Sequence, residues 1–333
     1  MVVGNMNKKN NISYEYKALD IIKFVATFLI VGSHALPLFN NELLNYYYGQ
    51  WFFRFSVPLF FISSGFFYER MNDEKKKAYI KRIISIYVIS SIIYIPLFFK
   101  NTSFLGFIYT LIFGYGHLWY LSSIIFALIT MYIFGKHLKY SNKKVILTII
   151  VLFLFGVMFD EYYKILNVTL INKIAGIINY IGGGRSFVFF ALPSLLVGVF
   201  ISKNLDKIKS HLTKKIYIYF AFSAILSFIE MAFIRNKLSN DITADLTLFN
   251  NIPAILIFII SLSISNESIK IKTRMLRKMS DIIYIIHILV LNLIMQKSTI
   301  NNFVAFIMCY IISLVISYII IKLQECIKKQ KIF

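Results

Sequence analysis

Apolar residues follow one another in long blocks along most of this chain, and short polar stretches separate the blocks. Most blocks hold close to 20 residues, the length of an α-helix that crosses the hydrocarbon core of a membrane. The pattern therefore predicts an all-α polytopic membrane protein with about ten transmembrane helices. The ten expected spans are 18–39, 51–68, 83–99, 117–134, 145–159, 186–202, 216–234, 247–265, 281–296 and 302–322.

Two further apolar segments do not fit the pattern of spans. The segment 104–113 is too short to cross a membrane alone, so we expect a re-entrant or interfacial element there. In the long loop 160–185, the stretch IAGIINYIGGG is expected to form a helix at the membrane surface. The first span lacks a cleavage site and is expected to remain uncleaved. The expected organisation is a cytoplasmic segment over 1–17, one transmembrane domain over 18–322 and a basic tail over 323–333.

Composition supports the membrane class, and the placement of charge predicts the orientation. The chain is 58% hydrophobic and 15% charged, with a net charge of +21, whereas soluble domains are roughly 25% charged. Of 36 Lys and Arg, 27 fall in the two terminal segments and in alternate loops, and 8 fall on the opposite side. Basic loops face the cytoplasm, so both termini are expected there, at the plasma membrane of a bacterium, with anionic lipid rather than nucleic acid as the partner.

Cysteine usage suggests neither a disulfide framework nor a metal site. Cys309 falls inside an apolar span and Cys326 falls in the basic tail, so a bond between them is not expected. The Cys and His positions show no spacing typical of a metal site, and no metal is expected.

Polar residues inside the first span form one stripe. Asp20, Lys23, Thr27 and His34 fall within about 60° of one another on a helix, with His34 roughly 20 Å along the axis from Asp20. Ionisable residues within a span usually mark a pathway or a site. A surface pair of Asp20 and Lys23 at the membrane edge, with a histidine bonded to a neighbouring helix, is the other reading.

Further polar residues occur near the ends of later spans. Ser280, Tyr284 and His287 share one face of the ninth span, where they either belong to a site or bond neighbouring helices. His117 opens the fourth span beside Trp119, and the aromatic pair that follows His117 is also typical of an ordinary membrane interface.

Two charged residues on the outer side are further candidates. Glu230 lies in an apolar helix about a turn and a half before Arg235, and a buried carboxylate needs a partner. A structural ion pair between these two residues is the alternative to a site. Arg185 follows three glycines, and a fixed guanidinium suits a carboxylate or a phosphate.

Five motifs in these regions resemble the acyltransferase 3 family of membrane acyltransferases, and the resemblance extends through almost the whole chain. The motifs occur in the family's order: DIIKFVATFLIVGSHALPL, SVPLFFISSGFFY, YIKRIISIY, HLWYLSSIIFAL and SDIIYIIHILVL. The family usually has Arg where Lys23 stands, and Lys keeps the charge but lacks the bidentate fork. The first motif and RSFVFF after Gly184 look most like a Gram-positive branch that includes the membrane domain of vancomycin-resistance serine racemases. The printed chain stops at Phe333, so we expect neither racemase activity nor an appended SGNH esterase from it.

The resemblance implies acyl transfer from a cytoplasmic acyl-CoA, with acetyl-CoA as the expected donor, to a hydroxyl of an extracytoplasmic cell-envelope glycan or lipid-linked sugar. Imidazole titrates in the range that a general base requires, and a covalent acyl relay on the same ring stays open. The expected roles are catalysis for His34 and His117, CoA phosphate binding for Lys23 and Arg82, and substrate or tunnel contacts for Asp20, Arg185, Glu230, Tyr284 and His287.

Two other functions remain open. A bundle of ten spans with embedded charges suits a transporter of a small solute such as serine, which would accumulate the solute without consuming acyl-CoA. A catalytically inactive scaffold for envelope assembly is the third candidate. The acceptor, the acyl chain and the oligomeric state are not specified by the sequence.

Overall fold

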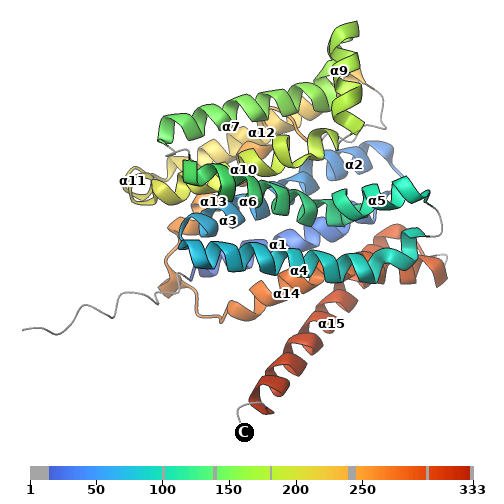
Figure 1. The fold of residues 1–333 in the computed structure, drawn as a ribbon, viewed down its shortest axis with the longest axis vertical. Helices are drawn as coiled ribbons and strands as arrows, with labels where there is room; N and C mark the ends of the chain where they lie inside the picture. The colour runs from blue at the N-terminus through green and yellow to red at the C-terminus, as the bar shows by residue number, and fades with distance from the viewer. Residues whose placement is uncertain are drawn as a thin grey trace, which may run out of the picture.

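The chain folds as a bundle of helices, described by a computed structural model over residues 15–99, 102–137, 141–180, 182–238, 245–297 and 300–330, which contain no strand. Figure 1 shows most helices running side by side, with α9 (Thr169–Tyr180) across one end. In these ranges, six helical segments are long and apolar enough to cross a membrane by length and composition. They are built on α4 (Asp73–Phe98), α6 (Trp119–His137), α7 (Asn142–Val157), α12 (Lys215–Lys237), α14 (Arg274–Lys297) and α15 (Asn302–Gln330).

The all-α class is confirmed, but the count of ten spans is not, because four expected spans lack the length or the composition of a membrane-crossing helix. The first, α1 (Lys17–His34), is an unbroken helix of 18 residues that carries three charges, at Lys17, Asp20 and Lys23. The second consists of the turns η1 (Tyr48–Phe52) and η2 (Phe53–Phe55) followed by α3 (Ser56–Glu69). The sixth begins with the π-helical turn η7 (Phe187–Ala191) before α10 (Leu192–Lys203), and the eighth is α13 (Asn251–Ser263).

All four elements contribute to the interior of the bundle, although α1 also exposes Val25. One buried cluster joins Leu19 of α1, Phe66 of α3, Ile201 of α10 and Phe258 of α13. Irregular backbone is tolerated at membrane depth where protein rather than lipid surrounds it. The length rule for a membrane span therefore does not apply to these helices.

Two glycines bring α3 and α10 into backbone contact. A Cβ atom added to Gly65 would lie 2.0 Å from the carbonyl oxygen of Leu195, and one added to Gly198 would lie 2.1 Å from the carbonyl oxygen of Ile62. Any larger residue at either position would force the helices apart. Gly65 of the second motif thus has a packing role.

The two apolar segments that did not fit the span pattern are both helical. Ser103 caps α5 (Phe104–Phe113), none of whose residues is buried. The expected surface helix forms over 174–180 as the second half of α9, which exposes Leu170 and Ile177, while position 181 lies outside the described residues. Contact of either helix with lipid remains a prediction.

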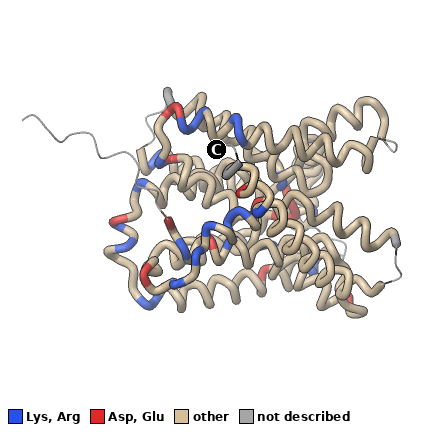
Figure 2. Tube along the Cα trace, turned by 90° about the horizontal axis from the view of Figure 1, so that it is seen from below, with Lys and Arg blue, Asp and Glu red and all other residues tan. Residues whose placement is uncertain are grey.

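Lys and Arg gather toward one end of the bundle (Figure 2). This end, called the basic end below, carries α11 (Leu205–Ser210), the turn between α3 and α4, and the connection from α13 to α14. The distribution follows the charge pattern of the sequence. Which side of the membrane the basic end faces remains a prediction.

Candidate functional site

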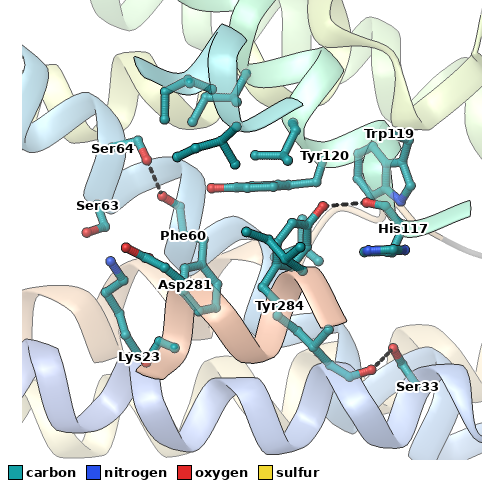
Figure 3. A pocket seen from close by; sticks show the side chains of 18 of the residues that line it. Lys23, Ser33, Phe60, Ser63, Ser64, His117, Trp119, Tyr120, Asp281 and Tyr284 are labelled. Atoms are coloured by element: carbon teal, nitrogen blue, oxygen red, sulfur yellow. Dashed lines mark hydrogen bonds between the residues drawn. The ribbon is translucent and has the colours of Figure 1, made fainter. Parts of the chain in front are cut away.

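A cavity of about 610 Å³ runs through the bundle between α1, α3, α4, α6 and α14. Near the basic end its wall carries Lys23 and Asp281, and Figure 3 shows His117 on the other side of the pocket. Lys23 and the cavity-lining His34 lie 11 positions apart on α1, which corresponds to about 16 Å of helix. The cavity therefore extends through much of the depth of the bundle. Its far part is called the histidine end and includes His34, His117, Arg54 and Arg185.

The polar residues of the stripe on α1 have two kinds of surroundings. Asp20 contacts another helix, whereas Lys23 and His34 line the cavity. Asp20 is buried, accepts a 2.8 Å hydrogen bond from the Thr273 hydroxyl and lies 3.7 Å from the Arg277 guanidinium. It thereby ties α1 to the start of α14 and does not line the cavity. Lys23 lines the cavity with its ammonium 5.3 Å from the Phe60 ring centre. Since Asp20 pairs with Arg277, the surface pair of Asp20 and Lys23 is not what the structure shows.

Three histidines from distant parts of the chain meet at the histidine end. The ring centre of His287 lies 5.2 Å from that of His34 and 4.9 Å from that of His117, and the His34 and His117 centres are 6.2 Å apart. His117 and His287 are buried, whereas His34 is accessible from the cavity. In the described part of the chain, no group of His, Cys, Asp or Glu side chains is arranged to hold a metal ion.

The hydrogen bonds of these histidines leave several ring nitrogens unpaired. The Nδ1 atom of His287 lies 2.8 Å from the carbonyl oxygen of Tyr284 and 3.1 Å from that of Ile283. A carbonyl only accepts, so Nδ1 carries the proton and Nε2 keeps a lone pair. Among the described residues, neither this Nε2 nor either ring nitrogen of His117 has a partner. A buried polar atom without a partner costs about 1–3 kcal/mol, so these nitrogens could each accept or donate a hydrogen bond to a ligand or a water.

Tyr284 and an aromatic wall hold the histidine end in shape. The Tyr284 hydroxyl donates to the carbonyl oxygen of His117 at 2.5 Å, which joins α14 to the turn η4 (Gly116–Leu118) before α6 (Figure 3). Tyr284 thus makes the interhelical bond that the sequence left open and also lines the cavity. Trp119 and Tyr120 line the cavity too, so they are not simply part of an interfacial belt.

The wall near the basic end carries cations that are only loosely paired. Arg82 lies 4.0 Å from the carboxylate of Asp281, and both side chains are exposed. Lys23 and Arg277 line the same region. Exposed cations at the mouth of a cavity suit the phosphates of a nucleotide-like ligand.

At the histidine end, two arginines share one carboxylate. Asp245 pairs through one oxygen with Arg54 and through the other with Arg185. Arg54 also donates to the side-chain oxygen of Gln50 at 2.8 Å. Sequence reasoning identified Arg185 but missed Arg54 and Asp245. The available signal for Arg54 was a single charge inside the apolar run WFFRFSV; the segment before α13 offered none for Asp245.

The structure places Glu230 away from the cavity. Its carboxylate accepts backbone N–H groups of Leu248 and Phe249 at 2.7 and 2.8 Å and the Tyr162 hydroxyl at 2.5 Å. Glu230 therefore fixes the segment that precedes α13. The guanidinium of Arg235 lies 5.6 Å from the Tyr46 ring centre.

Comparisons with known proteins agree with the motifs. Residues 16–322 match the acyltransferase 3 family, described as an acyltransferase domain, so this chain belongs to that family. It is also 33% identical over 217 residues to an amino-acid racemase of Enterococcus faecalis, covering 61% of this chain and 30% of that relative. A serine/alanine racemase of Enterococcus gallinarum is 22% identical over 212 residues, covering 57% and 30%. The chain thus spans under a third of the length of these relatives. No solved structure matches it.

Proposed function

We propose that this protein, integral to the plasma membrane of a bacterium, moves an acetyl group from cytoplasmic acetyl-CoA to a hydroxyl of an extracytoplasmic cell-envelope glycan or lipid-linked sugar. Membership of the family makes it a membrane acyltransferase in general. The observation that carries the finer proposal is the cavity that joins loosely paired cations to three clustered histidines, two of which, His117 and His287, have buried nitrogens without a partner among the described residues.

The basic end suits the donor. Lys23, Arg82 and Arg277 line the cavity wall, and their cationic groups complement the phosphates of CoA. A cavity of about 610 Å³ lies within the usual range for small-molecule sites, roughly 300–1,000 Å³. The acyl thioester would then extend along α1 toward His34, and the acceptor would enter from the other end.

The histidine end suits proton transfer. As the acceptor oxygen bonds to the thioester carbonyl carbon, the imidazole of His34 takes the hydroxyl proton; the carbon–sulfur bond then breaks, and the proton passes to the departing thiolate. The Nε2 lone pair of His287 is an acceptor close to His34, and His117 offers a second polar ring to the acceptor. Transfer through an acyl-imidazole on His34 is the alternative route.

The test is turnover of radiolabelled acetyl-CoA by the full chain in lipid nanodiscs. Loss of a general base lowers rates by about 10²–10⁴-fold, so His34→Ala should reduce transfer and CoA release by that factor. His211→Ala is the matched control because His211 is exposed on the basic end and bonds only its own turn. Wild-type turnover by a folded His34→Ala protein would contradict the proposal.

A second candidate is transport of a small solute such as serine. It is favoured by the match of 61% of this chain to a relative named amino-acid racemase. In proteoliposomes, a transporter would accumulate radiolabelled serine in the absence of any acyl-CoA, whereas the proposed enzyme would not. Serine accumulation without His34-dependent CoA release would replace the first proposal by the second.

A further inference from the structure

We propose that Arg185, held by Asp245 next to Arg54, binds an anionic group of the acceptor, so that the acylated hydroxyl belongs to a molecule that carries a carboxylate or a phosphate. This inference rests on the proposed acyl transfer and defines the chemical class of its acceptor. Its basis is the geometry of one guanidinium at the histidine end of the cavity.

The Arg185 guanidinium is held in place by one of its nitrogens, and its other donors are available to a ligand. Its Nε donates to Asp245, and its central carbon lies 5.9 Å from the Trp119 ring centre. Ser123 of α6 donates to the Arg185 carbonyl oxygen at 3.2 Å, which anchors the backbone. Across the described residues, the two terminal nitrogens of Arg185 make no hydrogen bond, although the side chain lines the cavity.

The Gly-rich turn before Arg185 explains how the side chain reaches this position. Gly182 and Gly183 have φ angles of 108° and 55°, which residues with a Cβ atom rarely adopt. The short turn η6 (Gly183–Arg185) then leads directly into η7. The positive φ angles of Gly182 and Gly183 therefore form the turn that brings Arg185 to the cavity wall.

The nearby acids leave donors on this wall unpaired. The two oxygens of Asp245 are occupied by Arg54 and Arg185. The adjacent Asp160 accepts the backbone N–H groups of Asp245 and Leu246, both at 2.9 Å, through a single oxygen. Within the described part of the chain, the buried Nε of Arg54 also lacks a partner. Guanidinium donors thus remain on both arginines.

An anion is the ligand that best satisfies this arrangement. The two terminal nitrogens of a guanidinium form a planar fork that matches two oxygens of a carboxylate or a phosphate. Arg54, Arg185 and His34 line the same cavity. One acceptor molecule can therefore place its anion on Arg185 and its hydroxyl at His34.

The experiment compares three small acceptors that share a hydroxylated three-carbon skeleton: glycerol, glycerate and glycerol 3-phosphate. Acetyl transfer by the full chain in nanodiscs should show a KM about 10–100-fold lower for one or both anions than for glycerol, as charged hydrogen bonds contribute about 1.5–3 kcal/mol. The anion with the lower KM distinguishes a carboxylate from a phosphate site. Arg185→Gln should abolish the preference, and Arg185→Lys should retain part of it through charge without the fork.

Lys173→Gln is the matched control because Lys173 is an exposed cation on α9 that does not line the cavity. It should leave the preference unchanged. Equal KM values for all three acceptors in the wild type, or a preference that survives in folded Arg185→Gln protein, would overturn the anion site. If Arg185→Gln protein fails to fold, Arg185→Lys provides the test. An unchanged ratio of the KM for glycerol to the KM for the anions in Arg185→Lys would then contradict the anion site.

A binding measurement separates this inference from the proposed function. Equilibrium binding of radiolabelled glycerate and glycerol 3-phosphate is measured on His34→Ala protein, with and without Arg185→Gln. Binding that requires Arg185, combined with no turnover by any variant, would support the anion site and reject acyl transfer. His34-dependent acetylation of glycerol, combined with no Arg185-dependent anion binding, would support acyl transfer and reject the anion site.

Discussion

At the basic end of the cavity, Arg82 and Asp281 lie 4.0 Å apart with side chains 68% and 53% exposed, whereas at the histidine end Arg54 and Asp245 are in direct contact and only 20% and 6% exposed. Exposed pairs are screened by water and contribute little to stability. Buried pairs have lost their water and depend on each other. The first arrangement suits a ligand that binds from solution and leaves again, and the second holds a site in a fixed geometry.

The backbone also differs between the two ends: it is regular near the basic end and irregular at the histidine end. The wall near the basic end comes from regular helices, such as α4 and the first turns of α14. The histidine end includes short irregular turns, such as η1, which contains Gln50, and η4, which contains His117. Such irregular backbone survives in a membrane only where it is buried or lines a cavity. Its presence here agrees with the cavity that this end of the bundle lines.

The largest expected difference between the two ends is in how much the loss of an acidic residue destabilises the protein. Asp245→Ala leaves two arginine side chains without their shared carboxylate, and removal of one partner of a buried pair costs about 3–5 kcal/mol. Asp281→Ala removes a partner of an exposed pair, which costs at most about 1 kcal/mol. Unfolding in nanodiscs, followed by tryptophan fluorescence against temperature, should show a large fall in Tm for Asp245→Ala and a small one for Asp281→Ala.

Similar Tm values for the two variants would contradict this contrast. Asp245→Asn gives a second measurement, because it keeps one acceptor oxygen while removing the charge. It should lie between the wild type and Asp245→Ala. Greater loss in Asp281→Ala than in Asp245→Ala would show that the basic end, rather than the histidine end, is the fixed part of the cavity.

The success of the span prediction depended on what each helix touches. In α4, Ile89 and Ile92 are exposed on the outside of the bundle, so the segment must satisfy the length and polarity that lipid demands. In α3, Phe61 and Phe66 are fully buried, and protein surrounds the helix. Apolar content is equal in both cases, so the sequence predicts an apolar helix without showing whether lipid or protein covers it.

Those residues of the candidate site that lie in family motifs could be predicted from the sequence, and those outside the motifs could not. The three histidines and Tyr284 lie in motifs of the family, and the structure brings them together, although their roles remain predictions. Asp245 carries no local signal, because its partner Arg185 is 60 positions away and only the tertiary fold joins them. Asp20 shows a different limit of the sequence: its helical phase matches that of Lys23, but its contact with Thr273 depends on where α14 begins.

A smaller effect is expected at the basic end, on donor binding. Arg82→Gln should raise the KM for acetyl-CoA about fivefold with little change in kcat, because contacts between exposed charges contribute about 1 kcal/mol. The wild-type KM should itself rise with salt as these contacts are screened, and the variant should be less sensitive to salt. The measurement is initial rate against acetyl-CoA concentration at low and high ionic strength.

Lys75→Gln provides the control for this prediction, because Lys75 is an exposed cation of the same helix that does not line the cavity. It should leave the KM for acetyl-CoA unchanged. An equal rise in KM for both variants would mean that the general charge of the basic end attracts the donor, without a specific contact from Arg82.

The smallest expected effect tests how the two ends are connected. Tyr284 lines the cavity between Asp281 and His287 on α14, and its hydroxyl holds the carbonyl oxygen of His117. Tyr284→Phe keeps the ring and removes one hydrogen bond worth about 0.5–1.5 kcal/mol, so kcat should fall by a factor of about two to ten. The KM for acetyl-CoA should remain unchanged, because the basic end does not use this hydroxyl. A change in that KM with unchanged kcat would show that Tyr284 contacts the donor rather than positioning His117.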